Sequence, residues 1–529
     1  MSLIAALNDL QHEHGWLPPE TLNELSARRG VALYEIQAVA SFYPHFHTEK
    51  PPARDVAVCR DVACHIRGGE ALHDSLRRAL ADDDVSVRPV SCLGRCDLPP
   101  AVCVDDVPLD GSDADRIARI AKGDEALVEA EPRPRRRWPM EAYDDGAAPY
   151  ATLARVRGGA LTETPALLKE AGLRGLGGAA FPAGLKWELV AKEPGPEKFV
   201  VCNADESEPG TFKDRVVLAE LPHLVVEGIA IAAHVVGAKR AWVFIRHEYE
   251  PERRALAAEI ERARDIGVLN DGFDLEIFVS PGGYILGEET ALLECMEDKR
   301  GEPRNKPPFP GQKGLWGKPT LINNVETFAA ATAILARGVD WWNDAGVREC
   351  KGFKFLSVCG DVERPDVYQV PMGTTVAELI ELAGGMKNGA PLKAFSPGGA
   401  SSDFLPASSA DAQLDFERMK DAGSMLGSGA LFVVSEGRDM VELGTNIVRF
   451  FRNESCGKCV PCRVGSEKAV GMLESIQRDG GRRDQLALLN ELADTMAQTS
   501  ICGLGQVAIN PILSVIRHFE DDVTAHVKD

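Results

Sequence analysis

The sequence has no long apolar run and no excess of basic residues. No stretch approaches the ~18 to 20 continuous apolar residues that a membrane-spanning helix needs, so we expect no membrane insertion. Lys and Arg number 59 against 80 Asp and Glu, and a net charge of −21 leaves no basic surplus to neutralise nucleic-acid phosphates. The first residues also lack the basic segment and apolar core of a signal peptide, which predicts a cytoplasmic protein.

Cysteine, by contrast, is frequent. Thirteen cysteines in a chain without an export signal would be kept reduced, which favours metal or redox chemistry over disulfides. Eight of them fall into two patterned groups. The others lie in apolar or mixed surroundings, and we interpret them as small buried hydrophobic residues. These others are Cys103, Cys202, Cys295, Cys350 and Cys359.

The first patterned group consists of two cysteine pairs. Cys59 and Cys64 have four residues between them, and Cys92 and Cys96 have three. Short apolar segments with strand character alternate with helical segments here, so two loops at strand ends could bring the pairs to one metal centre. Four thiolates satisfy a [2Fe-2S] cluster, while structural zinc remains an alternative because zinc pairs tolerate similar spacing.

The second group is a compact triplet with a distant fourth member. Cys456, Cys459 and Cys462 follow one another at two-residue intervals, and Cys502 comes forty residues later. Three closely spaced cysteines can wrap one corner of a cubane, and the fourth can close it. This pattern favours a [4Fe-4S] cluster over a tetrahedral zinc site.

A glycine-rich stretch at residues 172–178 is followed by an acidic run at 203–208. Bare main-chain amides at Gly172, Gly175, Gly177 and Gly178 allow close approach of a phosphate or a flat ring, which favours a nucleotide. A Rossmann fingerprint follows a strand, whereas the residues before this stretch have helical spacing. The sequence therefore predicts a nucleotide loop of another kind.

Several long motifs together indicate a family. The glycine-rich stretch, GGYILGEETALLE (282–294), KPPFP (306–310) and PTLINNVET (319–327) resemble the flavin- and NADH-binding subunit of respiratory complex I and its relatives. Those relatives include NAD-reducing hydrogenases and multi-subunit NAD-dependent formate dehydrogenases. EHGWLPPETLNEL and VASFYPHF, with the paired cysteines, resemble the thioredoxin-like [2Fe-2S] subunit, and ESCGKCVPCRVG resembles the [4Fe-4S] loop of the family.

The resemblance implies FMN and NAD sites beside the two clusters. Electron counting agrees, because NADH gives up two electrons as a hydride, clusters carry one at a time, and a flavin handles both steps. The implied FMN residues are Gly175, Gly177, Gly178, Lys186, Asn203, Asp205, Glu206, Asn323 and Asn324. The implied NADH-side residues are Phe181 and Phe309, which would stack the adenine, with Glu208, Tyr284, Gly287, Glu288 and Glu289.

Within this set, Glu208 and Tyr284 are the candidate catalytic residues. No acid or base is strictly required, because hydride passes directly to the flavin. The alternative interpretation makes Phe181 and Phe309 core residues and the glutamates a solvated helix face. By the same resemblance, the metal ligands are the eight cysteines Cys59, Cys64, Cys92, Cys96, Cys456, Cys459, Cys462 and Cys502.

We therefore expect an α/β multidomain protein. A chain of 529 residues has room for several domains, each with its own core. The predicted units are a helical unit plus a thioredoxin-like [2Fe-2S] domain at 1–126, a linker at 127–150, an FMN- and NAD-binding domain at 151–345, a ubiquitin-like β-grasp domain at 346–423, and a helical [4Fe-4S] domain at 424–529.

Three features lean toward one branch of the family. The fused [2Fe-2S] module, the GLRGLGG variant and the tail SICGLGQVAINPILSVIRHF resemble the β subunit of two-subunit NAD-dependent formate dehydrogenases. There, a separate α subunit with molybdenum or tungsten and further clusters oxidises formate. The resemblance thus implies such a partner. The alternatives are the NADH-oxidising subunit of a quinone reductase or hydrogenase and, from another class, a non-catalytic iron-sulfur scaffold.

Overall fold

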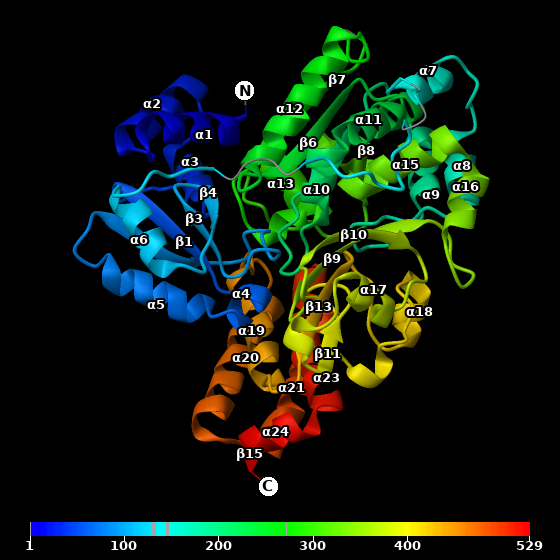
Figure 1. Ribbon diagram of the computed structural model, residues 1–529. Helices are drawn as coiled ribbons and strands as arrows, with labels where there is room; N and C mark the ends of the chain where they lie inside the picture. The colour runs from blue at the N-terminus through cyan, green and yellow to red at the C-terminus, as the bar shows by residue number, and fades with distance from the viewer. Residues whose placement is uncertain (1, 130–133, 144–145, 147, 271, 529) are drawn as a thin grey trace.

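The computed structural model describes residues 2–528 except 130–133, 144–145, 147 and 271. Figure 1 shows an N-terminal helical unit and sheet on one side, a large α/β domain on the other, and a β-grasp sheet and C-terminal helices below. The predicted linker at 127–150 falls partly outside the described residues. The predicted α/β multidomain class is confirmed.

The N-terminal part consists of three helices followed by a four-stranded sheet. Helix α2 begins with Pro19, where its missing N–H is not needed, and ends at Gly30, whose φ of 65° suits glycine. The sheet order is β2-β1-β3-β4, with β1 parallel to β2 and antiparallel to β3. The elements are α1 (Leu3–His14), α2 (Pro19–Arg29), α3 (Leu33–Ala40), β1 (Arg54–Cys59), α4 (Val62–Ile66), α5 (Gly69–Ala79), β2 (Val85–Val90), β3 (Ala101–Val104), β4 (Val107–Asp110) and α6 (Ala114–Lys122).

The central domain is built on a parallel sheet with the order β7-β6-β5-β8. Its inner strand β5 is almost wholly buried, as expected for a parallel strand covered on both faces. The strands are β5 (Phe199–Ala204), β6 (Arg240–Arg246), β7 (Asp274–Ser280) and β8 (Thr320–Asn324). The principal helices are α7 (Ala151–Arg157), α8 (Thr164–Glu170), α9 (Ala183–Lys192), α10 (Lys213–Glu220), α11 (Pro222–Val236), α12 (Glu250–Asp265), α13 (Glu289–Met296), α15 (Val325–Arg337) and α16 (Val339–Ala345).

The β-grasp domain has a five-stranded sheet, β10-β9-β13-β11-β12, with its own hydrophobic core. Strand β13 lies after Ser424, in the segment that the sequence predicted to be helical, yet it occupies the middle of this sheet. Its apolar run ALFVVS pairs with β9, far back in the chain, so the sheet extends past residue 423. The elements are β9 (Phe353–Gly360), β10 (Asp366–Pro371), α17 (Val376–Leu382), β11 (Leu392–Ser396), β12 (Leu405–Pro406), α18 (Phe416–Asp421) and β13 (Ala430–Ser435).

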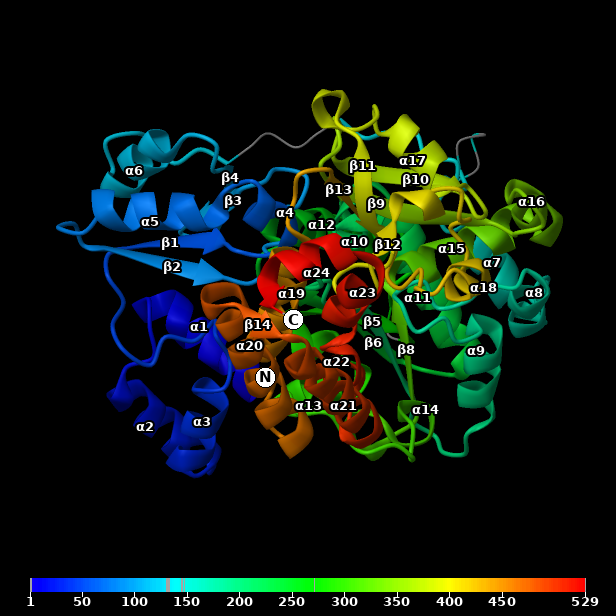
Figure 2. The ribbon, with the colours of Figure 1, turned by 90° about the horizontal axis from the view of Figure 1, so that it is seen from below.

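The C-terminal helices form the lower end of the molecule in Figure 1. Figure 2 shows them in the middle, between the N-terminal sheet and the β-grasp domain. Asn446 on α19 bonds the backbone of Arg60 and Val62, which fixes this helix to the first cysteine loop. The helices are α19 (Met440–Asn453), α20 (Val460–Asp479), α21 (Arg483–Thr499), α22 (Gly503–Val507), α23 (Asn510–His518) and α24 (Glu520–His526).

A helix that spans a membrane must be both long and apolar. Among the described residues, no single helix combines the necessary length and apolarity; α10 and α11 reach them only jointly, across a bend of 93°.

Candidate functional site

A cavity of about 350 Å³ opens at the carboxyl ends of β5 and β8. Asn203 and Asn324 sit opposite each other in the register of these strands, and both line the cavity. Ligands of parallel α/β sheets bind at this edge, because the loops that leave the strands meet there. Of the predicted cofactor residues, the cavity is lined by Gly177, Gly178, Asn203, Asp205, Glu206, Glu208, Tyr284, Gly287, Glu288 and Asn324.

The glycine loop forms one wall of this cavity. It follows helix α8, as the sequence predicted, and so differs from a Rossmann loop. A Cβ at Gly177 would lie 2.8 Å from Cβ of Asn324, and Gly178 has a φ of 121°. The Leu176 amide donates to Thr327 Oγ1 at 2.9 Å. The loop is therefore held against β8 and α15, and a side chain at Gly177 would displace Asn324.

The acidic run after β5 forms the floor. Burial raises the pKa of Asp205 to about 7, and its buried Oδ1 has no hydrogen-bond partner among the residues that the structure describes. A ligand donor could satisfy this oxygen. Glu206 is different, because its carboxylate accepts from the Asp214 and Arg215 amides at 2.8 and 3.2 Å and from the Tyr249 hydroxyl at 3.0 Å. Glu206 thus anchors the start of α10 while lining the cavity.

Glu208 and Tyr284 lie together on the side where the resemblance places NADH. The Glu208 carboxylate accepts from the Ser401 amide at 2.9 Å and from its hydroxyl at 2.5 Å, and burial raises the pKa of Glu208. Burial and the nearby Glu208 carboxylate raise the pKa of Tyr284 well above its usual range, so the phenol keeps its proton. The Tyr284 amide donates to Glu454 at 2.8 Å, just before the cysteine triplet.

The remaining predicted residues do not line the cavity. Lys186 donates to the Ile322 carbonyl at 2.7 Å and lies 3.5 Å from Glu289, while Asn323 accepts from Trp187. Phe181 and Phe309 are 44% and 54% exposed, which excludes the interpretation of both as core residues. Glu288 caps helix α13 with its side chain rather than facing solvent. The residues outside the cavity are Gly175, Phe181, Lys186, Glu289, Phe309 and Asn323.

The cavity also has walls that sequence reasoning missed. Lys213 is fully buried and pairs with Asp214 at 2.7 Å and with Glu326 at 2.9 Å. Their position shortly after the acidic run at 203–208 was the sequence signal that could have placed Lys213 and Asp214 at the cavity. The β-grasp domain and helix α22 supply most of the others. The missed lining residues include Thr211, Lys213, Asp214, Ser401, Met425, Gly427, Ser428, Gly503, Leu504 and Val507.

The two cysteine pairs of the N-terminal sheet converge. Cys92 Sγ lies 3.5 Å from Cys96 Sγ, and Cys59 is within hydrogen-bond reach of Cys64 and Cys92. All four thiols are buried. Arg246, also buried, joins this loop to the cavity floor, because it donates to the Cys92 carbonyl at 2.7 Å and to the Glu206 carbonyl at 2.5 Å.

The C-terminal cysteines also converge, around a second, smaller cavity. It is lined by Cys456, Cys459, Cys462 and Cys502, so the distant fourth cysteine does reach the triplet. Of the five scattered cysteines, four are buried, as the sequence predicted, whereas Cys350 is only half-buried.

Ile285 lines three adjoining cavities of the molecule. The first is the 350 Å³ cavity at the ends of β5 and β8, and the second is the C-terminal cysteine cavity. The third is a space of about 750 Å³ that reaches Cys92. Leu504 also lines the first two. Cofactors in the first two cavities would be separated by about one layer of side chains, which suits electron transfer between them.

Comparison with known proteins identifies the family of the chain. The model of the Nuo51 FMN-binding domain matches residues 168–333, and that of the NADH-ubiquinone oxidoreductase-F iron-sulfur binding region matches 442–526. An NADH-quinone oxidoreductase subunit of Rhizobium meliloti (strain 1021) is 42% identical over 371 residues, which cover 69% of this chain and 88% of that one. This chain belongs to the complex I 51 kDa family.

Its other parts match as well. A thioredoxin-like [2Fe-2S] ferredoxin model matches residues 1–123, which decides against zinc there, and an SLBB domain model matches 355–401. The NADP-reducing hydrogenase subunit HndC of Solidesulfovibrio fructosivorans is 41% identical over 403 residues, covering 74% of this chain and 81% of that one. A solved NAD⁺-reducing [NiFe]-hydrogenase in the H₂-reduced state has a chain with a TM-score of 0.91 and 32% identity, covering 100% of this chain and 94% of that one.

The cofactors are FMN and a [4Fe-4S] cluster from the 51 kDa part and a [2Fe-2S] cluster from the fused N-terminal part, with NAD(H) as substrate. The cavity at the ends of β5 and β8 fits the flavin in two respects. Among the described residues, the Asp205 Oδ1 acceptor has no hydrogen-bond partner, and Gly177 and Gly178 line the cavity without side chains. The two sets of four thiols have the chemistry that clusters of these types require.

Proposed function

We propose that this chain is the NAD-reducing, electron-transferring subunit of an NAD-dependent formate dehydrogenase complex. In this proposal a partner α subunit with molybdenum or tungsten and further clusters oxidises formate, and the present chain passes the electrons to NAD⁺. The observation that carries the electron-transfer role is the meeting of the flavin cavity and the C-terminal cysteine cavity at Ile285 and Leu504. The formate assignment rests on the GLRGLGG variant, the C-terminal tail and the fused [2Fe-2S] module.

The second candidate is a hydrogenase or quinone-reductase partner. The NAD⁺-reducing hydrogenase chain aligns over the whole length of this one, so the fused [2Fe-2S] module suits that partner equally. Both candidates require the same work from this chain, which is to exchange electrons between NAD(H) and its clusters. They differ in the enzyme that supplies the electrons.

FMN, when bound, would exchange a hydride with NAD(H) and single electrons with the clusters. The residues of the chain then have positioning and electrostatic roles. Glu208 would place a carboxylate beside the nicotinamide, where it favours the positively charged NAD⁺. Tyr284 would present a phenol that keeps its proton. Neither residue has to move a proton, because hydride passes directly between NAD(H) and the flavin. Phe181 and Phe309, exposed outside the cavity, remain available to stack an adenine.

The test is an anaerobic purification of the native complex, assayed for NAD⁺ reduction with formate and with hydrogen, and for NADH oxidation with a dye. We expect formate-dependent NAD⁺ reduction and a copurifying chain that contains molybdenum or tungsten. Hydrogen-dependent activity with nickel would assign the chain to the second candidate. Full flavin and iron without any activity would favour the non-catalytic scaffold.

Glu208→Gln tests the NADH side of the cavity. We expect FMN to stay bound, while the rate of NADH oxidation falls about 10- to 100-fold, because a charge-assisted contact worth about 1.5 to 3 kcal/mol is lost. The measurement is NADH:ferricyanide kinetics alongside flavin content. Glu261→Gln, on the exposed face of α12, is the matched control. Parallel loss of flavin and activity would move Glu208 from the nicotinamide side to the flavin or the fold.

A further inference from the structure

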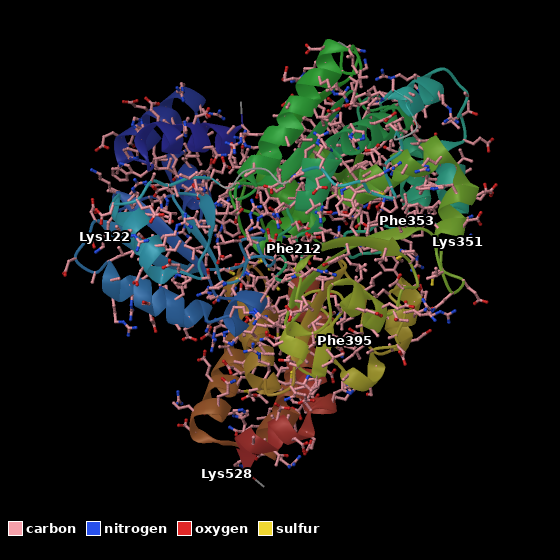
Figure 3. All side chains as sticks on the ribbon, viewed as in Figure 1. Lys122, Phe212, Lys351, Phe353, Phe395 and Lys528 are labelled. Atoms are coloured by element: carbon pink, nitrogen blue, oxygen red, sulfur yellow. The ribbon has the colours of Figure 1, made fainter. Side chains whose placement is uncertain are left out.

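The β-grasp domain reaches into the cavity with two loops. One connects β11 to β12 and brings Ser401; the other precedes β13 and brings Met425, Gly427 and Ser428. Thr211, from the segment after the acidic run, bonds Ser428 Oγ at 2.6 Å. Figure 3 labels Phe212 close to the meeting point of these domains, where its amide donates to Ser357 Oγ at 2.9 Å. The domain is thus part of the site and more than a surface addition.

The loop that carries Ser401 is fixed from within. Ser402 Oγ lies 2.7 Å from Ser396 Oγ and accepts from the Gly398 amide at 3.0 Å. A Cβ at Gly398 would lie 2.4 Å from the Met425 carbonyl oxygen, so the two β-grasp loops pack backbone to backbone. The sequence SPGGASS therefore encodes a rigid loop with no room for larger residues at its turn.

This loop closes directly on Glu208. Gly399 has a φ of 86°, and a Cβ there would lie 2.9 Å from Cδ of the Glu208 carboxyl group. Ser401 then directs both its amide and its hydroxyl at Glu208 Oε1. The loop thus approaches the carboxylate closely, and the two donors fix one of its oxygens.

We propose that Ser401 is a positioning residue for the nicotinamide site, through which the β-grasp domain orients the Glu208 carboxylate. This inference rests on the proposed role of Glu208 beside NAD(H). A buried carboxylate with free rotamers would spread its charge over several positions, whereas two donors on one oxygen fix its direction and lower its pKa against the larger, opposing effect of burial. The other groups that act on the Glu208 carboxyl are Ser428, Tyr284 and Cys92.

The test compares Ser401→Ala with Ser401→Thr in the full chain within its complex. We expect Ser401→Ala to raise the KM for NADH about tenfold in the ferricyanide assay, with unchanged flavin content and unchanged EPR signals of both clusters. Ser401→Thr keeps the hydroxyl and should restore KM to within about twofold of the wild type. Ser409→Ala, in the same domain but outside the cavity lining, is the control.

A double-mutant cycle decides whether Ser401 acts through Glu208. In a Glu208→Gln background, Ser401→Ala should change KM less than about twofold. Full additivity, or an unchanged KM in Ser401→Ala beside an active wild type, overturns this inference alone. A wild type that holds FMN but neither binds nor oxidises NADH overturns the proposed function and this inference with it.

Discussion

Cys459→Ser should abolish the [4Fe-4S] EPR signal while the [2Fe-2S] signal persists. Cys459 lines the C-terminal cysteine cavity with Cys456, Cys462 and Cys502, and a serine oxygen replaces a thiolate poorly in such a cluster. The iron content should fall by the share of one cluster. NADH oxidation by ferricyanide, which can take electrons at the flavin, should continue, whereas delivery to the partner subunit should stop.

The control for this variant is Cys350→Ser. Cys350 is half-buried and belongs to neither cysteine set, so both EPR signals and the iron content should match the wild type. An unchanged iron content in Cys459→Ser would contradict the ligand assignment. Loss of both EPR signals would show that the variant unfolds more than its own domain.

Glu326→Ala should destabilise the junction between the flavin domain and the β-grasp domain by about 3 to 5 kcal/mol. Glu326 is fully buried, with its carboxylate 2.9 Å from Lys213 Nζ and 2.5 Å from Lys354 Nζ. Those two lysines keep the pKa of Glu326 below its usual range against the opposing effect of burial. Without the carboxylate, two ammonium groups remain close together in a dry environment.

The measurement is hydrogen exchange of the amides in α15 and β9, because a chain with several domains does not unfold in one step. We expect both elements to lose protection, together with a lower FMN content, since Lys213 lines the flavin cavity. Glu417→Ala is the control, because Glu417 pairs with Arg174 at the surface and should contribute about 1 kcal/mol at most. Equal effects of the two variants would contradict a special role for the buried network.

Local patterns predicted the metal ligands and the strands. Cysteine spacing within loops such as 456–462 is set by the cluster, so it is visible in a short window of sequence. The short apolar segments near the N-terminal cysteine pairs were visible in the same way, and they form strands β1, β2 and β3. The amide and acidic residues at the ends of β5 and β8 line the cavity because the strands pair in register there.

Long-range contacts were not predictable in this way. Ser401 and Glu208 are separated by 193 residues, and no local pattern links a serine loop in one domain to a carboxylate in another. Strand β13 was missed for the same reason, because its place in the sheet depends on pairing with β9. The bond from the Lys186 amine to the Ile322 carbonyl was not visible in the sequence either, and the assignment of Lys186 to the flavin, which the resemblance implies, stays a prediction.

The wall formed by Ile285 limits how this protein can be recombined with its relatives. Each of the three spaces that it borders belongs mainly to a different structural unit, and all of them use the same short segment at 282–287. Swapping the C-terminal helices or the N-terminal module for those of another enzyme would change what packs against that segment. A functional chimera would therefore have to transplant residues 282–287 together with the incoming unit, even though they lie in neither.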